Sequence, residues 1–289
     1  MTNNSLNELT GANLFFKCEN FQKAGSFKIR GATNTVELLS QNEMDKGVAT
    51  TSSGNHGAAL SMAVTRRGGK TKVVMPHNTP KIKVINVERN GGEVVWCEPD
   101  QTSREQVLAD LVNETGATVV HPYNDERIIA GQGTCAKELL EDYPEIQIIV
   151  SPVSGGGLLS GTLISAKEIN EQVSVYGAEP VEADDAFRSL QNGEILPNET
   201  INTICDGLRA QIGTITFPII QKHVKEIITL SEEEILNSMK MIWERLKIIV
   251  EPSCSISLAA IIKNKDKFSG KNVGLIMSGG NVDLNQIPW

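Results

Sequence analysis

The sequence lacks the features of several protein classes. No block of five or more like charges occurs among its 289 residues, and the net charge is −8, which argues against nucleic acid and anionic membrane surfaces as partners. No apolar run reaches the roughly 18 residues that a membrane-spanning helix needs. Residues 1–10 are polar and lack the apolar core of a signal peptide. We therefore expect a soluble, cytoplasmic protein.

Cysteine is scarce and follows no pattern. The five cysteines are odd in number and none stands in Cys-x-x-Cys spacing, so neither a disulfide framework nor a zinc site is indicated. We expect free thiols in a reducing compartment. With 40% apolar and 21% charged residues the composition is that of an ordinary globular protein. The length allows one large domain or two of moderate size.

The sequence does contain an alternation of short apolar segments and helix-forming segments. Residues 146–150 are almost continuously apolar, as expected of a strand that is buried on both faces. Such alternation with short loops predicts an α/β protein with helices on both faces of parallel sheets. We expect strands at 14–18, 47–51, 71–75, 94–96, 118–120, 146–150, 173–178 and 273–277, and helices at 28–40, 58–67, 103–114, 128–141, 158–169, 232–246, after 80 and from 257.

One lysine stands where a loop is expected to turn into a helix. This is Lys28, in the segment Lys-Ala-Gly-Ser-Phe-Lys-Ile-Arg-Gly-Ala at 23–32, where Ser26 can cap the first turn. The helix's positive end and the apolar neighbours Phe27 and Ile29 disfavour the ammonium form. A neutral amine can form a Schiff base with an aldehyde cofactor. Taken alone, however, the segment is more typical of a solvated surface lysine.

Two further segments have the composition of ligand-binding loops. Residues 154–157, Ser-Gly-Gly-Gly, lie between an expected strand and an expected helix, where backbone amides can converge on a phosphate; a tight turn fits equally well. A dinucleotide loop is rejected because Gly-Gly-Gly-Leu-Leu-Ser breaks the G-x-G-x-x-G pattern in mid-chain. Residues 52–57, Ser-Ser-Gly-Asn-His-Gly, also open a helix, and they can hold a carboxylate or simply cap that helix.

In this order the three segments resemble one family, the fold-type II pyridoxal-phosphate enzymes, in the serine racemase and serine/threonine dehydratase branch. The resemblance runs from about 2 to 284 and includes Glu-Pro at 179–180, Ala-Asp-Asp at 183–185 and Leu-Ile-Met-Ser-Gly-Gly-Asn-Val-Asp at 275–283. It is strongest with eukaryotic serine racemases. It implies an α/β fold like that of the tryptophan synthase β subunit, with two open, twisted, mostly parallel sheets. The large domain would comprise 1–46 and 125–289, and the small domain 47–124.

The resemblance also implies how pyridoxal 5′-phosphate would be held. Lys28 would form the Schiff base, Phe27 would pack nearby, and Asn55 would hydrogen-bond the ring hydroxyl. Ser278 would face the pyridine nitrogen and moderate the ring as an electron sink. Many relatives have glycine in place of Ser154, but amide donors survive that change. The implied cofactor-binding residues are Phe27, Lys28, Asn55, Ser154, Gly155, Gly156, Gly157, Leu158 and Ser278.

The same resemblance assigns catalytic and substrate-binding residues. Lys28 and Ser53 would act as acid and base on opposite faces of the substrate. The substrate would be bound by Ser52, Ser53, Asn55, His56 and Arg104. A packed helix residue remains an equal alternative for His56, and a surface arginine for Arg104.

The activity implied is a serine racemase that interconverts L- and D-serine. It would also dehydrate serine and L-threonine to pyruvate or 2-oxobutanoate and ammonia, and we expect a homodimer. One alternative is a serine/threonine or 3-hydroxyaspartate ammonia-lyase with little racemisation. A second is an inactive or regulatory homologue, because relatives begin with a further helix and a Thr-Pro-Val strand before the segment that matches Met1.

Two accessory sites are implied as well. Glu179, the Ala183 carbonyl and Asp185 match a divalent cation site, and oxygen ligands suit Mg²⁺ or Ca²⁺; a solvated acidic turn is the alternative. ATP would act as a nucleotide effector. The positions that match its site are Lys23, Lys247 and Asn281, whereas Ala24 and Asn90 replace a threonine and a tyrosine that the site would use.

Overall fold

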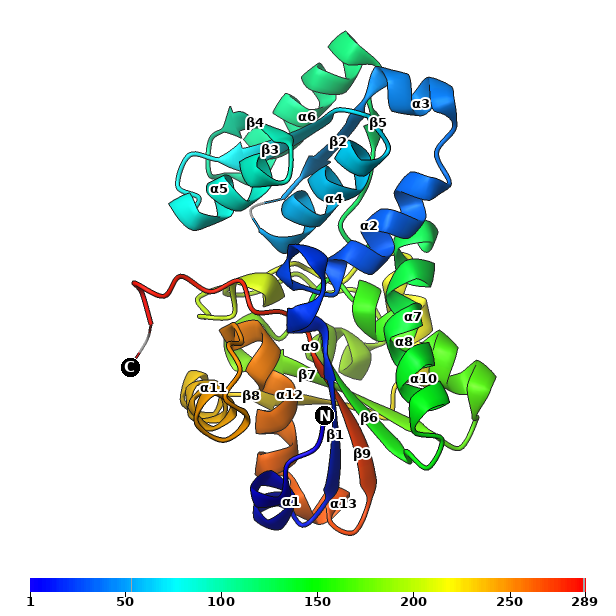
Figure 1. Ribbon diagram of the computed structural model, residues 1–289, viewed down its shortest axis with the longest axis vertical. Helices are drawn as coiled ribbons and strands as arrows, with labels where there is room; N and C mark the ends of the chain where they lie inside the picture. The colour runs from blue at the N-terminus through cyan, green and yellow to red at the C-terminus, as the bar shows by residue number, and fades with distance from the viewer. Residues whose placement is uncertain (53, 288) are drawn as a thin grey trace. The chain divides into compact units, whose positions relative to one another are not determined.

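The computed structural model describes residues 1–52, 54–287 and 289. The chain forms two compact units, the first from Met1–Phe21 and Gln132–Trp289, the second from Gln22–Gly131. Each unit contains one parallel sheet covered by helices (Figure 1). The α/β class with two parallel sheets is therefore confirmed. The expected domain boundaries at 47 and 124 stay a prediction.

The first unit is built on a five-stranded sheet in the order β1-β9-β6-β7-β8. Every residue of β6 is buried, as expected of a strand covered on both faces. β8 was not predicted, because its short segment Glu-Ile-Ile-Thr-Leu follows a helix that the sequence did not reveal either. The strands are β1 (Asn13–Cys18), β6 (Ile148–Pro152), β7 (Ser174–Pro180), β8 (Glu226–Leu230) and β9 (Asn272–Met277).

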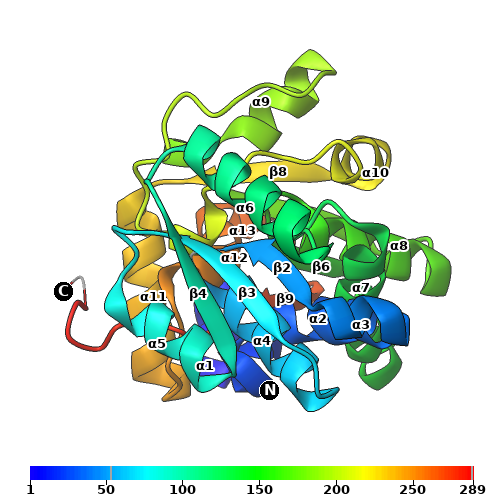
Figure 2. The same cartoon turned by 90° about the horizontal axis from the view of Figure 1, so that it is seen from above.

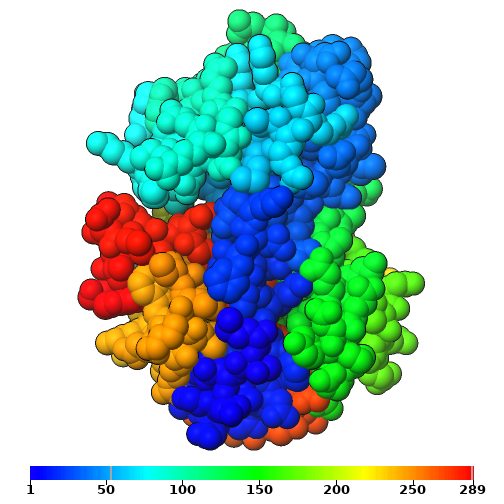
Figure 3. All heavy atoms as spheres, in the orientation of Figure 1, coloured from blue at the N-terminus to red at the C-terminus, as the bar shows by residue number. Residues whose placement is uncertain are grey.

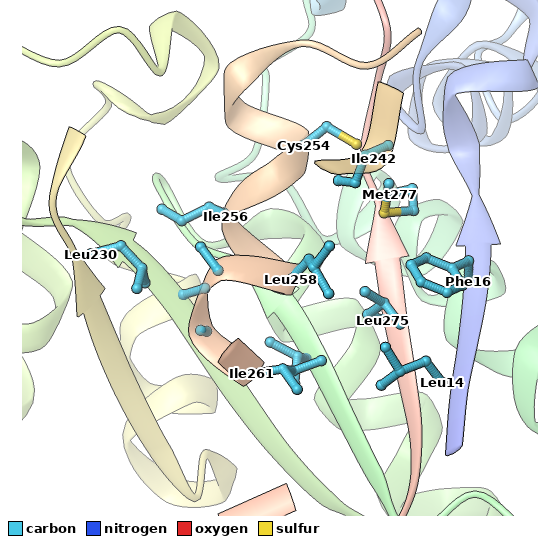
Figure 4. Close-up of a cluster of buried hydrophobic side chains, with 14 of the residues drawn as sticks. Leu14, Phe16, Leu230, Ile242, Cys254, Ile256, Leu258, Ile261, Leu275 and Met277 are labelled. Carbon is cyan, nitrogen blue, oxygen red and sulfur yellow. The ribbon is translucent and has the colours of Figure 1, made fainter. Parts of the chain in front are cut away.

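Helix α12 (Pro252–Lys263) is the central helix of the first unit and packs against β6, β7, β8 and β9. Its apolar side chains meet those of β1 and β9 in the core (Figure 4). It begins at Pro252 rather than at 257, because proline suits the first helical position. The other helices are α1 (Asn4–Thr10), α7 (Glu126–Asp142), α8 (Gly157–Ile169), α9 (Asp185–Asn192), α10 (Thr216–His223), α11 (Glu232–Leu246) and α13 (Lys265–Phe268).

The second unit contains a four-stranded sheet in the order β4-β3-β2-β5. Helices α4 (Asn55–Arg66) and α5 (Lys81–Arg89) cover one face, and α6 (Gln101–Thr115) covers the other (Figure 2). The strands are β2 (Val48–Thr51), β3 (Thr71–Pro76), β4 (Gly92–Cys97) and β5 (Thr118–Val119).

Helix α2 (Lys28–Glu37) packs on α4. It ends three residues before the expected limit at 40, because Ser40 and Glu43 form a capping box that starts α3 (Gln41–Lys46).

The C-terminal segment lies on the surface of the first unit against α11 (Figure 3). There the Trp289 ring stands 5.1 Å from the Trp243 ring, edge to face. Within the described residues, no helix has both the length and the apolar character needed to cross a membrane.

Candidate active site

The two units carry different parts of the predicted site, and each part is described by itself. In the second unit, Lys28 is the first residue of α2 and its Nζ donates a hydrogen bond to the Pro122 carbonyl at 2.8 Å. The Phe27 ring centroid is 5.3 Å from Nζ. Burial lowers the pKa of Lys28 from 10.5 to about 8. The environment therefore favours the neutral amine.

Ser26 does not cap α2, contrary to the sequence-based expectation. The N-cap position is occupied by Phe27 without any side-chain cap. The Ser26 hydroxyl is buried and has no hydrogen-bond partner within the described chain. Its position one residue further from the helix leaves the hydroxyl out of reach of the first-turn amides.

His56 is a buried neighbour of Lys28 rather than an exposed cation. Its side chain is 2% exposed, and Nε2 lies 3.4 Å from the Val120 carbonyl oxygen. Burial, and secondly the charge of Lys28, lower the pKa of His56 to about 3. A neutral ring supplies no charge to a carboxylate, which supports the alternative that His56 is a packed helix residue. Its contact with substrate stays a prediction.

Ser52 occupies the start of α4 as a capping residue. Its Oγ accepts hydrogen bonds from the amides of Gly54 at 3.3 Å and Gly57 at 3.0 Å. A Cβ atom on Gly54 would lie 3.5 Å from Lys83 Nζ, so a cation stands beside the helix's positive end. This combination suits a carboxylate. Asn55 is the first residue of the helix, and Ser53 lies outside the described residues.

Arg104 lies on α6, at the end of β4. Burial raises the pKa of the Cys97 thiol and the charge of Arg104 opposes that rise, which places the two side chains together. Within the described residues, no printed hydrogen bond or ion pair joins Arg104 to residues 52–57. Its role in substrate binding stays a prediction.

In the first unit, the glycine segment forms the N-terminus of α8. Gly156 is the N-cap with φ 90°, a conformation that glycine adopts readily, and a Cβ there would lie 2.7 Å from Thr216 Oγ1. No hydrogen bond in the described chain uses the amides of Gly155, Gly156 or Gly157 as donors. These amides and the helix's positive end therefore fit a phosphate.

The glycine segment is anchored by two hydroxyl groups. Thr216 Oγ1 donates to the Gly155 carbonyl at 2.6 Å and accepts from the Gly213 amide at 3.0 Å. Ser154 Oγ accepts from the Ala210 amide at 3.0 Å and donates to the Ala210 carbonyl at 3.1 Å. Sequence reasoning did not identify Thr216, because no local motif marks a threonine 60 residues along the chain from the loop that it supports.

Ser278 follows β9 and is 3% exposed. Its hydroxyl has no hydrogen-bond partner among the described residues. A buried hydroxyl of this kind can bond a ligand atom, so Ser278 fits the predicted contact with a pyridine nitrogen. Together with the glycine segment, it makes the first unit compatible with pyridoxal phosphate.

Two buried carboxyl groups lie together at the end of β7. Glu179 is fully buried, and its carboxylate accepts from the amides of Ala186 at 3.2 Å and Phe187 at 2.8 Å. Burial, and secondly the charge of Asp185, raise the pKa of Glu179 well above its usual value. Burial also raises the pKa of Asp185 to about 6, while the Ile212 amide donates to it at 2.7 Å.

This pair fits the predicted divalent cation site. A cation would stabilise both ionised carboxylates, which otherwise repel each other in a desolvated place. Ala183 is buried on the turn between Glu179 and Asp185. The described residues contain no cluster of three or more His, Cys, Asp or Glu side chains that could hold a metal ion. The predicted set does not need one, since it consists of two carboxylates and a carbonyl.

The predicted nucleotide positions are distributed over both units. Lys23 is exposed at the start of a 3-10 turn in the second unit. In the first unit, Lys247 is the C-cap of α11 with φ 58°, and Asn281 follows β9. The nucleotide site therefore stays a prediction.

Comparison with known proteins gives a consistent result. A family model described as pyridoxal-phosphate dependent enzyme matches residues 2–279. The beta-hydroxyaspartate dehydratase of Paracoccus denitrificans is 49% identical, with 100% of this chain and 91% of that protein covered. The serine racemase of Arabidopsis thaliana is 48% identical, with 99% and 88% covered. The structure of maize serine racemase superposes with a TM-score of 0.96 at 45% identity, covering 99% of this chain and 88% of the other.

The Thr216 anchor leads to a testable prediction. Thr216→Val removes the hydroxyl that joins Gly155 to Gly213, and each lost hydrogen bond costs roughly 0.5–1.5 kcal/mol. Pyridoxal phosphate should then bind about tenfold more weakly, as measured by spectroscopic titration. Thr162→Val is the matched control, because the Thr162 hydroxyl on α8 is buried without a partner in the described chain. Equal affinities of the two variants would contradict the anchoring role.

Proposed function

This chain belongs to the pyridoxal-phosphate dependent enzymes, and we propose that it is a serine racemase that also dehydrates serine and threonine. The observation that carries the proposal is the environment of Lys28. Its amine is desolvated, its pKa is lowered to about 8, and it opens a helix in the second unit. Such an amine is available at neutral pH both to hold an aldehyde cofactor and to act as a base.

The residues of the chain would divide the chemistry as follows. When bound, pyridoxal phosphate withdraws electrons from the Cα of an attached amino acid and so acidifies its proton. The amides of residues 155–157 would bind the phosphate, and the Ser278 hydroxyl would bond the ring nitrogen. Lys28 would hold the cofactor and, once released by the substrate's amino group, take the Cα proton from one face.

The outcome at Cα depends on a second group. In a racemase, the Ser53 hydroxyl would return a proton to the opposite face and produce the other enantiomer. In a dehydratase, the β-hydroxyl would leave instead, and hydrolysis would give pyruvate and ammonia from serine. Both outcomes use the same removal of the Cα proton, so they differ by partition rather than by site.

A 3-hydroxyaspartate ammonia-lyase is the second candidate. It is supported by the Paracoccus relative at 49% identity and by the position of Lys83 beside Gly54. A lysine at that place could bind the second carboxylate of a dicarboxylic substrate. Comparing kcat/KM for L-serine and 3-hydroxyaspartate separates the two proposals, since a preference of tenfold or more for the dicarboxylate would favour this candidate.

The assignment of Lys28 is tested by chemical reduction. Borohydride treatment of the enzyme with its cofactor should attach the cofactor to the peptide that contains Lys28, as read by mass spectrometry. Lys28→Ala should abolish the visible absorbance of the bound cofactor. Lys70→Ala changes an exposed lysine of the same unit and should retain it. Attachment to any other lysine would refute the assignment and would support an inactive homologue if no attachment occurred at all.

Ser53→Ala distinguishes racemisation from elimination. The variant should lose L-to-D conversion and the breakdown of D-serine, because one lysine cannot serve both faces of Cα. Elimination from L-serine needs only Lys28 for the Cα proton, so pyruvate formation should survive at least in part. Chiral chromatography for serine and a coupled assay for pyruvate give both quantities. If the variant interconverts enantiomers at the unaltered rate, Ser53 is not the second base.

We also propose that Glu179, the Ala183 carbonyl and Asp185 bind Mg²⁺ or Ca²⁺. Chelation should lower the melting temperature of the unaltered enzyme, and either cation should restore it, because the two buried carboxylates repel each other without it. In a Glu179→Gln, Asp185→Asn variant the response to chelator should vanish. Glu182→Gln removes an acid from the same turn and should keep the response. An unchanged response in the double variant would argue against the site.

A further inference from the structure

The turn that faces Lys28 is capped by a histidine. His121 Nδ1 accepts hydrogen bonds from the amides of Tyr123 at 3.3 Å and Asn124 at 2.9 Å. The His121 ring also meets the Tyr123 ring edge to face, with centroids 4.6 Å apart. Bonds to the amides two and three residues ahead reproduce the pattern of an Asx turn. Only an unprotonated Nδ1 can accept, so the neutral ring carries its proton on Nε2.

Within this turn the Pro122 carbonyl accepts the Lys28 amine at 2.8 Å. The chain before the turn is held by Val120, whose amide donates to the Ala49 carbonyl at 2.9 Å and whose carbonyl meets His56 Nε2. Proline has no amide of its own to donate. The position of the Pro122 carbonyl is therefore set by β5 and α4 on one side and by the His121 cap on the other.

We propose that His121 is a positioning residue for Lys28. By capping residues 121–124 it holds the Pro122 carbonyl where that oxygen accepts the Lys28 amine whenever the amine is not bonded to the cofactor. The consequence is a single, desolvated location for the free amine. The importance of that location rests on the proposed role of Lys28, whereas the contact itself does not.

The cap has a defined dependence on pH. The titratable groups that face His121 are Lys28, His56 and Asp125. Partial burial lowers the pKa of His121, the charge of Lys28 lowers it further, and Asp125 acts in the opposite direction. The accepting, neutral ring therefore persists below the usual pKa of a histidine. As pH falls through the lowered pKa, Nδ1 gains a proton, the two amides lose their acceptor, and the cap is lost.

The test uses the protein without cofactor and follows the reactivity of Lys28. Acetylation by trace acetic anhydride, quantified on the Lys28 peptide by mass spectrometry across pH, reports the neutral amine. The unaltered protein should show a midpoint near pH 8, in line with the lowered pKa of Lys28. In His121→Ala the turn should open, water should reach the amine, and the midpoint should rise. At a fixed neutral pH, labelling falls roughly tenfold for each unit of that rise.

Two further variants make the comparison specific. His121→Asn should restore most of the original midpoint, because a carboxamide oxygen accepts from the same two amides. His77→Ala removes an exposed histidine of the same unit that stacks on Trp96, and it should match the unaltered protein. An unchanged Lys28 midpoint in a folded His121→Ala protein would overturn the proposal.

A spectroscopic measurement on the unaltered protein keeps the proposal testable even if His121→Ala does not fold. Long-range ¹H–¹⁵N NMR should show His121 with its proton on Nε2 at neutral pH; a proton on Nδ1 would overturn the cap. Failure of the proposed function has a different signature. Borohydride would then attach the cofactor to another lysine, while the acetylation midpoint of Lys28 would still depend on His121.

Discussion

The amine of Lys28 in its desolvated setting is the constraint on which the second unit's chemistry depends. Burial alone would leave a costly ammonium ion, so the pKa falls and the amine becomes neutral. The Pro122 carbonyl then supplies the hydrogen bond that a buried amine requires. Neighbouring elements serve this contact, since α4 contributes His56 and the segment after β5 contributes the turn that His121 caps.

The first unit solves the opposite electrostatic problem, the placement of negative charge. The amides at the start of α8 are left without acceptors in the described chain, and Thr216 and Ser154 hold their backbone in place. At the end of β7, Glu179 and Asp185 are buried together, and their pKa values rise in response. Both places become favourable when a ligand of complementary charge binds, which links ligand binding to stability.

Much of this arrangement could be predicted from local patterns. The glycine segment, the Ser231 capping box and the continuously apolar strand β6 follow from residues close together in the chain. Other features could not, because their partners are distant. Ser26 was expected to cap α2 but does not reach it, β8 carried too short a pattern to be recognised, and Thr216 supports a loop 60 residues away.

The sequence by itself determined the α/β class, the family, and the residue types that can hold an aldehyde cofactor and its phosphate, because these depend on short segments in a set order. Only the tertiary structure decided the ionisation of those residues. Lys28 is neutralised by burial, His56 is neutral because it is enclosed beside Lys28, and Pro122 meets the amine because a turn 94 residues away is folded against α2. Desolvation depends on what packs around a group, which no local pattern specifies.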